Sequence, residues 1–452
     1  MTSSPLLQPL FTTARMAETF SDRARLQAML DFEAALARGS ARAGAIPAEA
    51  AGPIAARCRA ELLEAEGIAR EAAEAGNPAI PMVRALTALV ARDDERAARW
   101  VHFGATSQDA MDTGLVLQLR AALAHLEADL DRLSAALAGL AAAHRGTVLA
   151  GRTWLQQAAP VTFGLKAAGW LSAVERHGER LRELLPRLLV LQLGGAVGTL
   201  AAFGPTGLAV AERTAEDLGL GVPDLPWHAH RDRIAEVATA LGLLVGTLGK
   251  IARDVALLAQ TEVAEVAEPS APGRGGSTAM PQKQNPVGSA VALAAAVRVP
   301  GLVSVMLAAM AQEHERGLGG WQAEWETLPE ICALAAGALD RMAQVMEGIV
   351  LDPVRMRLNA EAGAGALHAS AVADALARSL GRSGAHALVA EAARRARAEG
   401  RHLRDVLGAD ERVAAHLSAA ELRRLFEPGA GSAGALVDRA LERLARRGGR
   451  RG

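Results

Sequence analysis

Residues 119–140, LRAALAHLEADLDRLSAALAGL, carry leucines at alternating spacings of four and three residues. These leucines are Leu119, Leu123, Leu126, Leu130, Leu133, Leu137 and Leu140. The spacing predicts a helix about 33 Å long, at 1.5 Å per residue, with one apolar seam along its whole length. Because charged residues decorate its other faces and the neighbouring segments are also apolar, we expect this helix to belong to an extended helical bundle.

The rest of the chain is also predicted to be helical. Only 3% of its 452 residues are aromatic, and alanine, leucine, glutamate and arginine predominate, which favours helices over strands. Helical patterns run through residues 22–38 after a possible Ser21 cap, through 235–268, and from 287 to about 350 with a break at 317–320. The pattern changes near residue 110 and at 352–353. We therefore predict an all-α protein with three helical domains, residues 1–110, 111–351 and 352–452.

The charge and cysteine content exclude several classes of function and partner. Forty-nine basic side chains against fifty acidic ones give a net charge of -1, and no basic face carries stacking aromatics, so we expect no nucleic-acid partner. Cys58 and Cys332 lie far apart in apolar contexts, which predicts two buried thiols and no disulfide. The chain shows neither a signal peptide nor an unbroken apolar span. We therefore expect a cytoplasmic protein with no membrane partner.

Cofactor motifs are missing from the sequence as well. No HxH or HExxH pattern occurs, so we expect no metal. The glycines of LGGAVGT, residues 193–199, lack the GxGxxG spacing and a preceding strand. We therefore expect no nucleotide cofactor.

The segment GRGGSTAMPQKQNP, residues 273–286, contains a mixture that no core element needs. Its glycines let the backbone bend and bring N–H groups close to a ligand. Ser277 supplies a proton-transfer group, Lys283 a positive charge and Asn285 an oriented amide. We interpret this segment as a mobile, anion-binding catalytic loop.

A second polar segment, HFGATSQDAMDT at residues 102–113, directly precedes the leucine-rich helix. Thr106 and Ser107 would present hydroxyls and N–H groups at the start of that helix, as a cradle for a carboxylate. Simple capping by Thr106, Ser107 or Asp109 would explain the same residues.

Two further segments are polar and contain glycines. GRTWLQQAAPVTFG, residues 151–164, is expected to end one helix and open another, with polar side chains around Trp154, and a lone tryptophan is usually a core residue. In QEHERGLGGWQAEW, residues 312–325, Arg316 could clamp a carboxylate through two hydrogen bonds. A surface salt-bridge network is the alternative for this second segment.

Together these segments resemble the fumarase/aspartase superfamily, whose members share a GSSxMPxKxNP loop, a threonine-serine segment before a long helix, and a GRTHxQ segment. The loop GSTAMPQKQNP matches that pattern at Gly276, Ser277, Met280, Pro281, Lys283, Asn285 and Pro286. FSDRARLQAMLDFEAALA, LGGAVGT, PWH with RDR, and QEHERGLGGWQAEW are most similar to its branch of bacterial carboxymuconate cycloisomerases. The resemblance covers nearly the whole chain.

The resemblance implies a fold and a set of roles. The fold would be three helical domains, with the central helices of four subunits in one bundle and active sites where three subunits meet. Ser277 would transfer the proton, and Lys283 and Asn285 would hold the carboxylate that gains charge. The substrate would be a small tricarboxylate, with no cofactor. Its remaining contacts would be His102, Thr106, Ser107, Trp154, Gln156, Met280 and Arg316.

One departure from the superfamily pattern bears on the reaction. The histidine of GRTH is replaced by Trp154. A carboxylate attacks or leaves as a stable anion with a pKa near 4, so forming a lactone needs no proton handled at that position. His314 could act as a substitute acid or base, or be structural, and His230 stands where glutamine is expected.

Two alternatives remain open. A lyase that releases fumarate from a succinyl adduct, such as adenylosuccinate, would share the loop, but Trp154 argues against it. So does Asn77 in AGNPAIP, where adenylosuccinate lyases usually carry a histidine-aspartate pair. The other alternative is a non-catalytic helical scaffold, and the intact set of Ser277, Lys283 and Asn285 argues against that.

Overall fold

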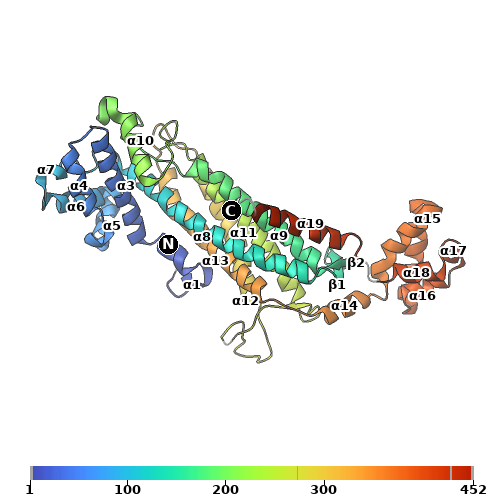
Figure 1. Ribbon diagram of the computed structural model, residues 1–452. Helices are drawn as coiled ribbons and strands as arrows, with labels where there is room; N and C mark the ends of the chain where they lie inside the picture. The colour runs from blue at the N-terminus through green and yellow to red at the C-terminus, as the bar shows by residue number, and fades with distance from the viewer. Residues whose placement is uncertain (1–3, 272, 428–429, 449–452) are drawn as a thin grey trace. The chain divides into compact units, whose positions relative to one another are not determined.

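The computed structural model describes residues 4–271, 273–427 and 430–448, and helices dominate these residues (Figure 1). Four short strands in two antiparallel pairs complete the described part. The predicted all-α class is confirmed. By its internal contacts the chain divides into two compact units: unit 1 comprises 1–130, 176–249 and 291–341, and unit 2 comprises 131–175, 250–290 and 342–452. The three-domain division follows chain order instead, and it stays a prediction.

The leucine-rich segment forms helix α8, Ser107–Ala143. Six of its seven seam leucines are buried, from Leu119 to Leu137, and Leu140 is partly buried. The helix begins where the polar segment predicted a cap, since the backbone N–H of Thr106 donates to Asp109 Oδ2 at 2.9 Å. The seam is therefore confirmed as part of the core.

Unit 1 holds the N-terminal helices and α10. Ser21 Oγ accepts a hydrogen bond from Ala24 N–H at 3.1 Å, which confirms the predicted cap of α3. A Cβ at Gly39 would lie 2.4 Å from Thr214 Oγ1, so glycine lets α3 and α10 pack closely. The bounds are α1 Gln8–Phe11, α2 Ala14–Thr19, α3 Asp22–Arg42, α4 Ala51–Arg57, α5 Ala65–Ala75, α6 Ala79–Ala91, α7 Glu95–Ala98 and α10 Gly207–Leu218, with 3-10 turns at Ala48–Ala50, Ala60–Leu62 and Ala201–Thr206.

Four more long helices follow α8: α9 Phe163–Leu188, α11 Asp232–Leu258, α12 Val287–Ala308 and α13 Gly320–Gly348. The gap between α12 and α13 confirms the break predicted at 317–320. The pattern predicted through residue 268 was wrong at its end, because α11 ends at Leu258 and the chain then forms strand β3, Val266–Ala267, which pairs with β4, Val350–Leu351.

Two of these helices are apolar over a membrane-spanning length. Within the described residues they are α11 and α12, whose most apolar windows are 61% and 22% buried. The side chains of Val297, Val305 and Leu307 on α12 are 80%, 40% and 50% exposed. Much of the apolar surface of α12 is therefore not covered by this chain.

A β-hairpin in unit 2 replaces the helix ends predicted at residues 151–164. Strand β1, Val148–Thr153, pairs with β2, Gln156–Thr162, and Thr153 stands opposite Gln156. The two turn residues, Trp154 and Leu155, have φ of 52° and 63°, as two-residue hairpin turns require. Trp154 is 96% exposed, so it is not a core residue of this chain.

The C-terminal helices complete unit 2. Asp352 caps α14, Pro353–Glu361, as the change of pattern there predicted. The short helices expected next include a long one, α15, Ala369–Glu399, which bends at Gly381 with φ of 70°. It shares a core that includes Leu376, Leu388 and Val406 with its neighbours. The others are α16 Leu403–Gly408, α17 Glu411–Ala414, α18 Ala419–Leu425, α19 Ala433–Gly448 and a 3-10 turn, Ala366–His368.

Both cysteines are free and buried, as predicted. Cys58 lies at the C-cap of α4, and Cys332 lies within α13.

Candidate active site

The loop of residues 273–286 is an irregular turn in unit 2. Gly273 and Gly275 have φ of 80° and 72°, a conformation that favours glycine. The N–H of Asn285 donates to the carbonyl of Gly275 at 2.8 Å, and its side-chain amide donates to the carbonyl of Gly276 at 3.3 Å. Asn285 therefore closes the loop at its base as well as offering an amide.

The Ser277 hydroxyl is held by its own loop. Its Oγ accepts hydrogen bonds from the N–H groups of Ala279 and Met280, at 3.3 and 3.1 Å. Two donors on one oxygen favour its alkoxide, because they compensate the developing negative charge. Lys283 and Met280 belong to the same turn, where Lys283 N–H donates to the Met280 carbonyl at 3.1 Å. Both side chains are exposed.

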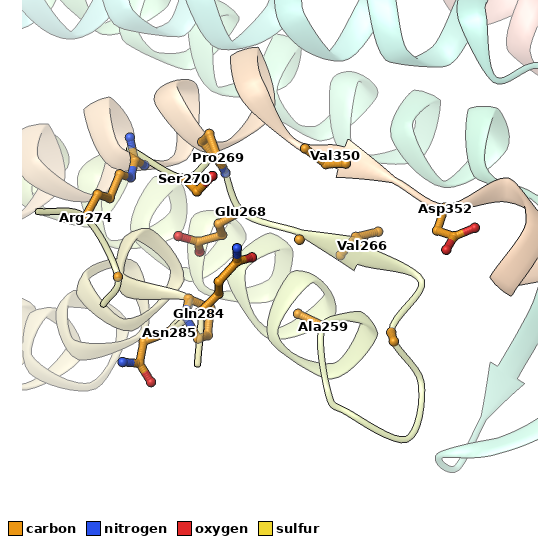
Figure 2. Close-up of a pocket in the computed structure, with 14 residues that line it drawn as sticks. Ala259, Val266, Glu268, Pro269, Ser270, Arg274, Gln284, Asn285, Val350 and Asp352 are labelled. Carbon is orange, nitrogen blue, oxygen red and sulfur yellow. The ribbon is translucent and has the colours of Figure 1, made fainter. Parts of the chain in front are cut away.

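A cavity of about 340 Å³ opens beside the loop (Figure 2). Asn285 is among its lining residues, together with Glu268, Arg274 and Gln284, whereas Ser277, Met280 and Lys283 are not. Glu268 also fixes the start of α12, because its carboxylate accepts from the N–H groups of Gly288 and Ser289 at 2.9 and 2.8 Å. A carboxylate at a helix N-terminus stabilises that end, so Glu268 anchors the segment that follows the loop.

His102 in unit 1 is fixed by a residue that the sequence did not single out. Its Nδ1 lies 2.6 Å from Glu33 Oε1, and the Glu33 side chain is fully buried. Burial opposes the charged imidazolium, but the Glu33 charge and hydrogen bond outweigh it, so the pKa of His102 is raised above 6.5. Glu33 falls on the buried stripe of α3 with Leu26, Leu30 and Ala37, and a charge in that stripe was the signal available in the sequence.

Arg316, the candidate carboxylate clamp, and Thr106 of the candidate cradle contact each other within unit 1. Arg316 Nη1 donates to Thr106 Oγ1 at 2.9 Å, and its Nε donates to Gln108 Oε1 at 3.1 Å. Ser107 is the first residue of α8 beside them. The capping interpretation is therefore confirmed, since Asp109 caps the helix, and the cradle stays a prediction in which Thr106 faces a guanidinium.

Buried hydrogen bonds of Asp109 hold this segment in place. Asp109 accepts hydrogen bonds from the N–H groups of Gly194 and Gly195 at 3.0 and 2.9 Å, and its Oδ1 lies 2.7 Å from His228 Nε2. His228 thus helps to hold Asp109, the residue that caps α8, in unit 1. His230, whose role was left open, is exposed.

Arg231 is the centre of a second buried network. It pairs with Asp112 at 2.7 Å and with Glu324 at 2.6 Å, and all three side chains are at most 2% exposed. Burial disfavours the guanidinium charge, but the two carboxylates outweigh it and hold the pKa of Arg231 above its ordinary value. Trp321 Nε1 also donates to Asp112 at 3.0 Å. These contacts tie α8 to α13, the helix that follows the Arg316 segment.

The hairpin carries Trp154 and Gln156 at its exposed tip. Its strands are anchored by Arg152, which makes two hydrogen bonds to the buried Glu265 carboxylate, at 2.9 and 2.7 Å. Asn359 on α14 donates to the same carboxylate at 2.9 Å and accepts from Gln157 at 2.8 Å. Hydrogen bonds to Glu265 and Asn359 therefore hold the strands that carry the exposed tip.

The predicted site residues fall into two groups, each held within one unit. Unit 1 carries His102, Thr106, Ser107 and Arg316, and unit 2 carries Trp154, Gln156, Ser277, Met280, Lys283 and Asn285. His314 is exposed, with φ of 50°. In the part of the chain that the structure describes, no three His, Cys, Asp or Glu side chains form a group that could hold a metal ion.

Two family models match the chain. The model described as lyase matches residues 11–301, and the one described as adenylosuccinate lyase C-terminus matches residues 365–440. The chain therefore belongs to the lyase family of the fumarase/aspartase superfamily.

Relatives refine that placement. The 3-carboxy-cis,cis-muconate cycloisomerase of Pseudomonas aeruginosa is 58% identical over 97% of this chain and 96% of its own length, and that of Pseudomonas putida is 55% identical over 93% and 100%. The solved 3-carboxy-cis,cis-muconate lactonizing enzyme from Pseudomonas putida superposes with a TM-score of 0.92 at 53% identity, over 98% of this chain and 99% of that one. Within the superfamily, the chain groups with the 3-carboxy-cis,cis-muconate cycloisomerases.

Proposed function

We propose that this protein converts 3-carboxy-cis,cis-muconate to 4-carboxymuconolactone, as a step of protocatechuate breakdown. The observation that carries the proposal is the similarity, over almost the whole chain, to relatives named for that activity. The Pseudomonas aeruginosa relative is 58% identical. The loop with Ser277, Lys283 and Asn285 and the replacement of the GRTH histidine by Trp154 agree with it.

The reaction is an intramolecular addition. An oxygen of the distal carboxylate bonds to the carbon that bears the 3-carboxyl, and the adjacent double bond breaks. Its electron pair takes a proton at the neighbouring carbon, alpha to the C1 carboxylate. Negative charge accumulates on the C1 carboxylate between the two events. No cofactor is needed, because the conjugated acid itself accepts the charge.

Ser277 is the proposed proton carrier, acting as the acid in lactone formation and the base in reversal. The N–H groups of Ala279 and Met280 support this role, because they donate to Ser277 Oγ and would stabilise it after the proton has left. One such donor to a developing oxyanion lowers the reaction barrier by about 3 kcal/mol. Lys283 and Asn285 would hold the C1 carboxylate as it gains charge.

The other carboxylates need separate donors. The pair of Thr106 and Arg316 supplies a hydroxyl and a guanidinium 2.9 Å apart, and His102 is charged below its raised pKa. We assign these residues, with Ser107 and Gln156, to the remaining carboxylates. Trp154 and Met280 would form apolar walls that keep water from the intermediate.

We further propose a cytoplasmic homotetramer whose active sites combine residues of different subunits. The uncovered apolar side chains of α12 support this assembly, because a second copy would bury them. The exposure of Trp154 at the hairpin tip supports it too. A side chain that forms an apolar wall of a pocket must be shielded from water, and within this chain Trp154 is exposed.

The direct test follows the ultraviolet absorbance of 3-carboxy-cis,cis-muconate with purified protein, which should fall as the diene is consumed. Ser277→Ala should abolish the loss while leaving the assembly intact. Thr278→Ala, which removes an exposed hydroxyl from the same loop, should stay active. Fumarate release from adenylosuccinate, with the diene untouched, would overturn the assignment in favour of the lyase alternative.

Shared active sites have their own test. Ser277→Ala and Arg316→Gln should each be inactive alone. Mixing the two variants through a cycle of dissociation and reassembly should restore part of the activity, because some mixed sites receive both intact residues. Reassembled mixtures that stay inactive, beside reassembled wild type that recovers, would contradict shared sites.

A further inference from the structure

A cavity of about 550 Å³ in unit 2 is lined by none of the proposed site residues. It lies between the foot of the β1–β2 hairpin, helix α14 and the C-terminal helices. Its volume falls in the range of about 300–1,000 Å³ that is usual for small-molecule sites. The residues used below are Val148, Arg357, Glu361, Gly365, Leu367, His368, His402, Arg404 and Phe426.

Three rings form one wall of this cavity. The centroids of His368 and His402 lie 5.3 and 5.6 Å from that of Phe426, with planes tilted by 43° and 56°. Leu367 and Val148 add apolar surface. The rings pack on one another at distances typical of aromatic pairs, and they give a flat, conjugated ligand an aromatic wall to contact.

The position of His402 is built into the backbone. A Cβ at Gly365, where φ is 82°, would lie 2.4 Å from His402 Cε1, so only glycine admits the ring. His402 Nδ1 accepts from Arg404 N–H at 3.2 Å, which places the proton of a neutral ring on Nε2. Burial lowers the pKa of His368, which favours the neutral form of that ring.

Two arginines, Arg357 and Arg404, line the cavity. Arg357 has no hydrogen-bond or ion-pair partner among the described residues. Arg404 contacts Asp405 through Nε and Nη2, both at 3.2 Å, which leaves its Nη1 available. Glu361 is the one carboxylate in the lining. Asp405 offsets the charge of Arg404, so the donors left for an anion are the Arg357 guanidinium and Arg404 Nη1, and a guanidinium matches the planar geometry of a carboxylate.

We propose that this cavity binds a small, flat, conjugated carboxylate, with its body against Phe426 and the two imidazole rings and its carboxylates at Arg357 and Arg404. Aromatic acids and open-chain diene acids share this chemistry. The ligand would contact both the hairpin and α14, which are already joined where Gln157 donates to the Asn359 carbonyl.

Calorimetry on the full-length assembled protein tests the site with four probes. Phthalate is a flat aromatic dianion and cis,cis-muconate its open-chain counterpart, while inorganic phosphate lacks the flat body and benzamide lacks the charge. We expect one or both dicarboxylates to bind, which identifies the source, and phosphate and benzamide to bind far more weakly. Phosphate binding as tight as either dicarboxylate, or no dicarboxylate binding, would overturn the proposal.

Variants locate the bound probe. Arg357→Gln and Phe426→Leu should each weaken dicarboxylate binding, Arg357→Gln by about tenfold or more. Arg378→Gln, an exposed arginine of α15 outside the cavity, should not. Binding should persist in Lys283→Met, which removes the loop cation of the proposed active site. If binding were lost only in Lys283→Met, the probe would be bound at the proposed active site, and the proposal for this cavity would be refuted.

Hydrogen exchange gives a readout that does not depend on a variant. The bound dicarboxylate should slow exchange in residues 353–368 and 402–406. Protection confined to residues 273–286 or 102–109 would contradict the assignment. Because neither binding nor exchange requires turnover, failure here leaves the proposed reaction untouched.

Discussion

The substitution Glu33→Gln removes a buried charge beside His102 with almost no change in shape. Glu33 Oε1 lies 2.6 Å from His102 Nδ1, and Glu33 Oε2 is buried without a hydrogen-bond partner. A hydrogen bond to a charged group contributes about 1.5–3 kcal/mol. Its loss should lower the ratio of charged to neutral imidazole by about tenfold to a hundredfold at a fixed pH.

The sign of the pH effect follows from the raised pKa of His102. The charged imidazolium is present below that pKa, so binding of a substrate carboxylate should weaken as the pH rises through it, above 6.5. The contribution of the pair to stability should be lost over the same window. In Glu33→Gln burial lowers the pKa of His102 and only the Asp109 charge still raises it, so both losses should begin at lower pH.

The assay is a proton NMR titration of His102, assigned with His102→Asn, beside kcat/KM measured against pH. Asp31→Asn is the matched control, because it removes an exposed carboxylate from the same helix α3. The control should titrate like wild type. A His102 titration that is the same in Glu33→Gln and wild type would refute the proposed coupling.

Three further substitutions test the supports of the site. Arg231→Met strands two buried carboxylates and should cost about 3–5 kcal/mol of unfolding free energy in urea at neutral pH, and a loss below 1 kcal/mol would be inconsistent with the network. Gly104→Ala places a Cβ 2.4 Å from the Phe203 ring, at φ of 75°, and should cost about 1–3 kcal/mol, seen as a lower Tm. Glu268→Ala frees the Ser289 N–H and should cost about 1–2 kcal/mol at the start of α12, seen as faster amide exchange there; unchanged exchange would argue against an anchoring role.

Local patterns in the sequence predicted the features that neighbouring residues determine. The leucine seam of α8, the Ser21 cap and the break at 317–320 each depend on contacts within one helix or at its ends. Helical periodicity and capping are visible over a few residues, so one sequence was sufficient for them. The contact between Thr106 and Arg316 was not of this kind, and the resemblance to a family had only named both residues as contacts of the substrate.

Long-range contacts account for what the sequence did not reveal. The β1–β2 hairpin turns at Trp154 and Leu155, where the strong Asn-Gly or Asp-Gly signal is missing. Glu265, which anchors the strand through Arg152, lies 113 residues further along the chain. The hairpin is therefore held by tertiary contacts that override a weak local preference.

The side chains proposed to act in catalysis are exposed, whereas side chains that hold the backbone in place are buried. Lys283 and Trp154 lie on turns exposed to solvent, whereas the Glu265 carboxylate that braces the hairpin in the same unit is buried and paired. A buried pair contributes little net stability but is costly to break, so it fixes backbone positions without requiring the exposed groups to be rigid themselves. The proposed catalytic groups, presented on braced but uncovered turns, are suited to the proposed site that other subunits would complete.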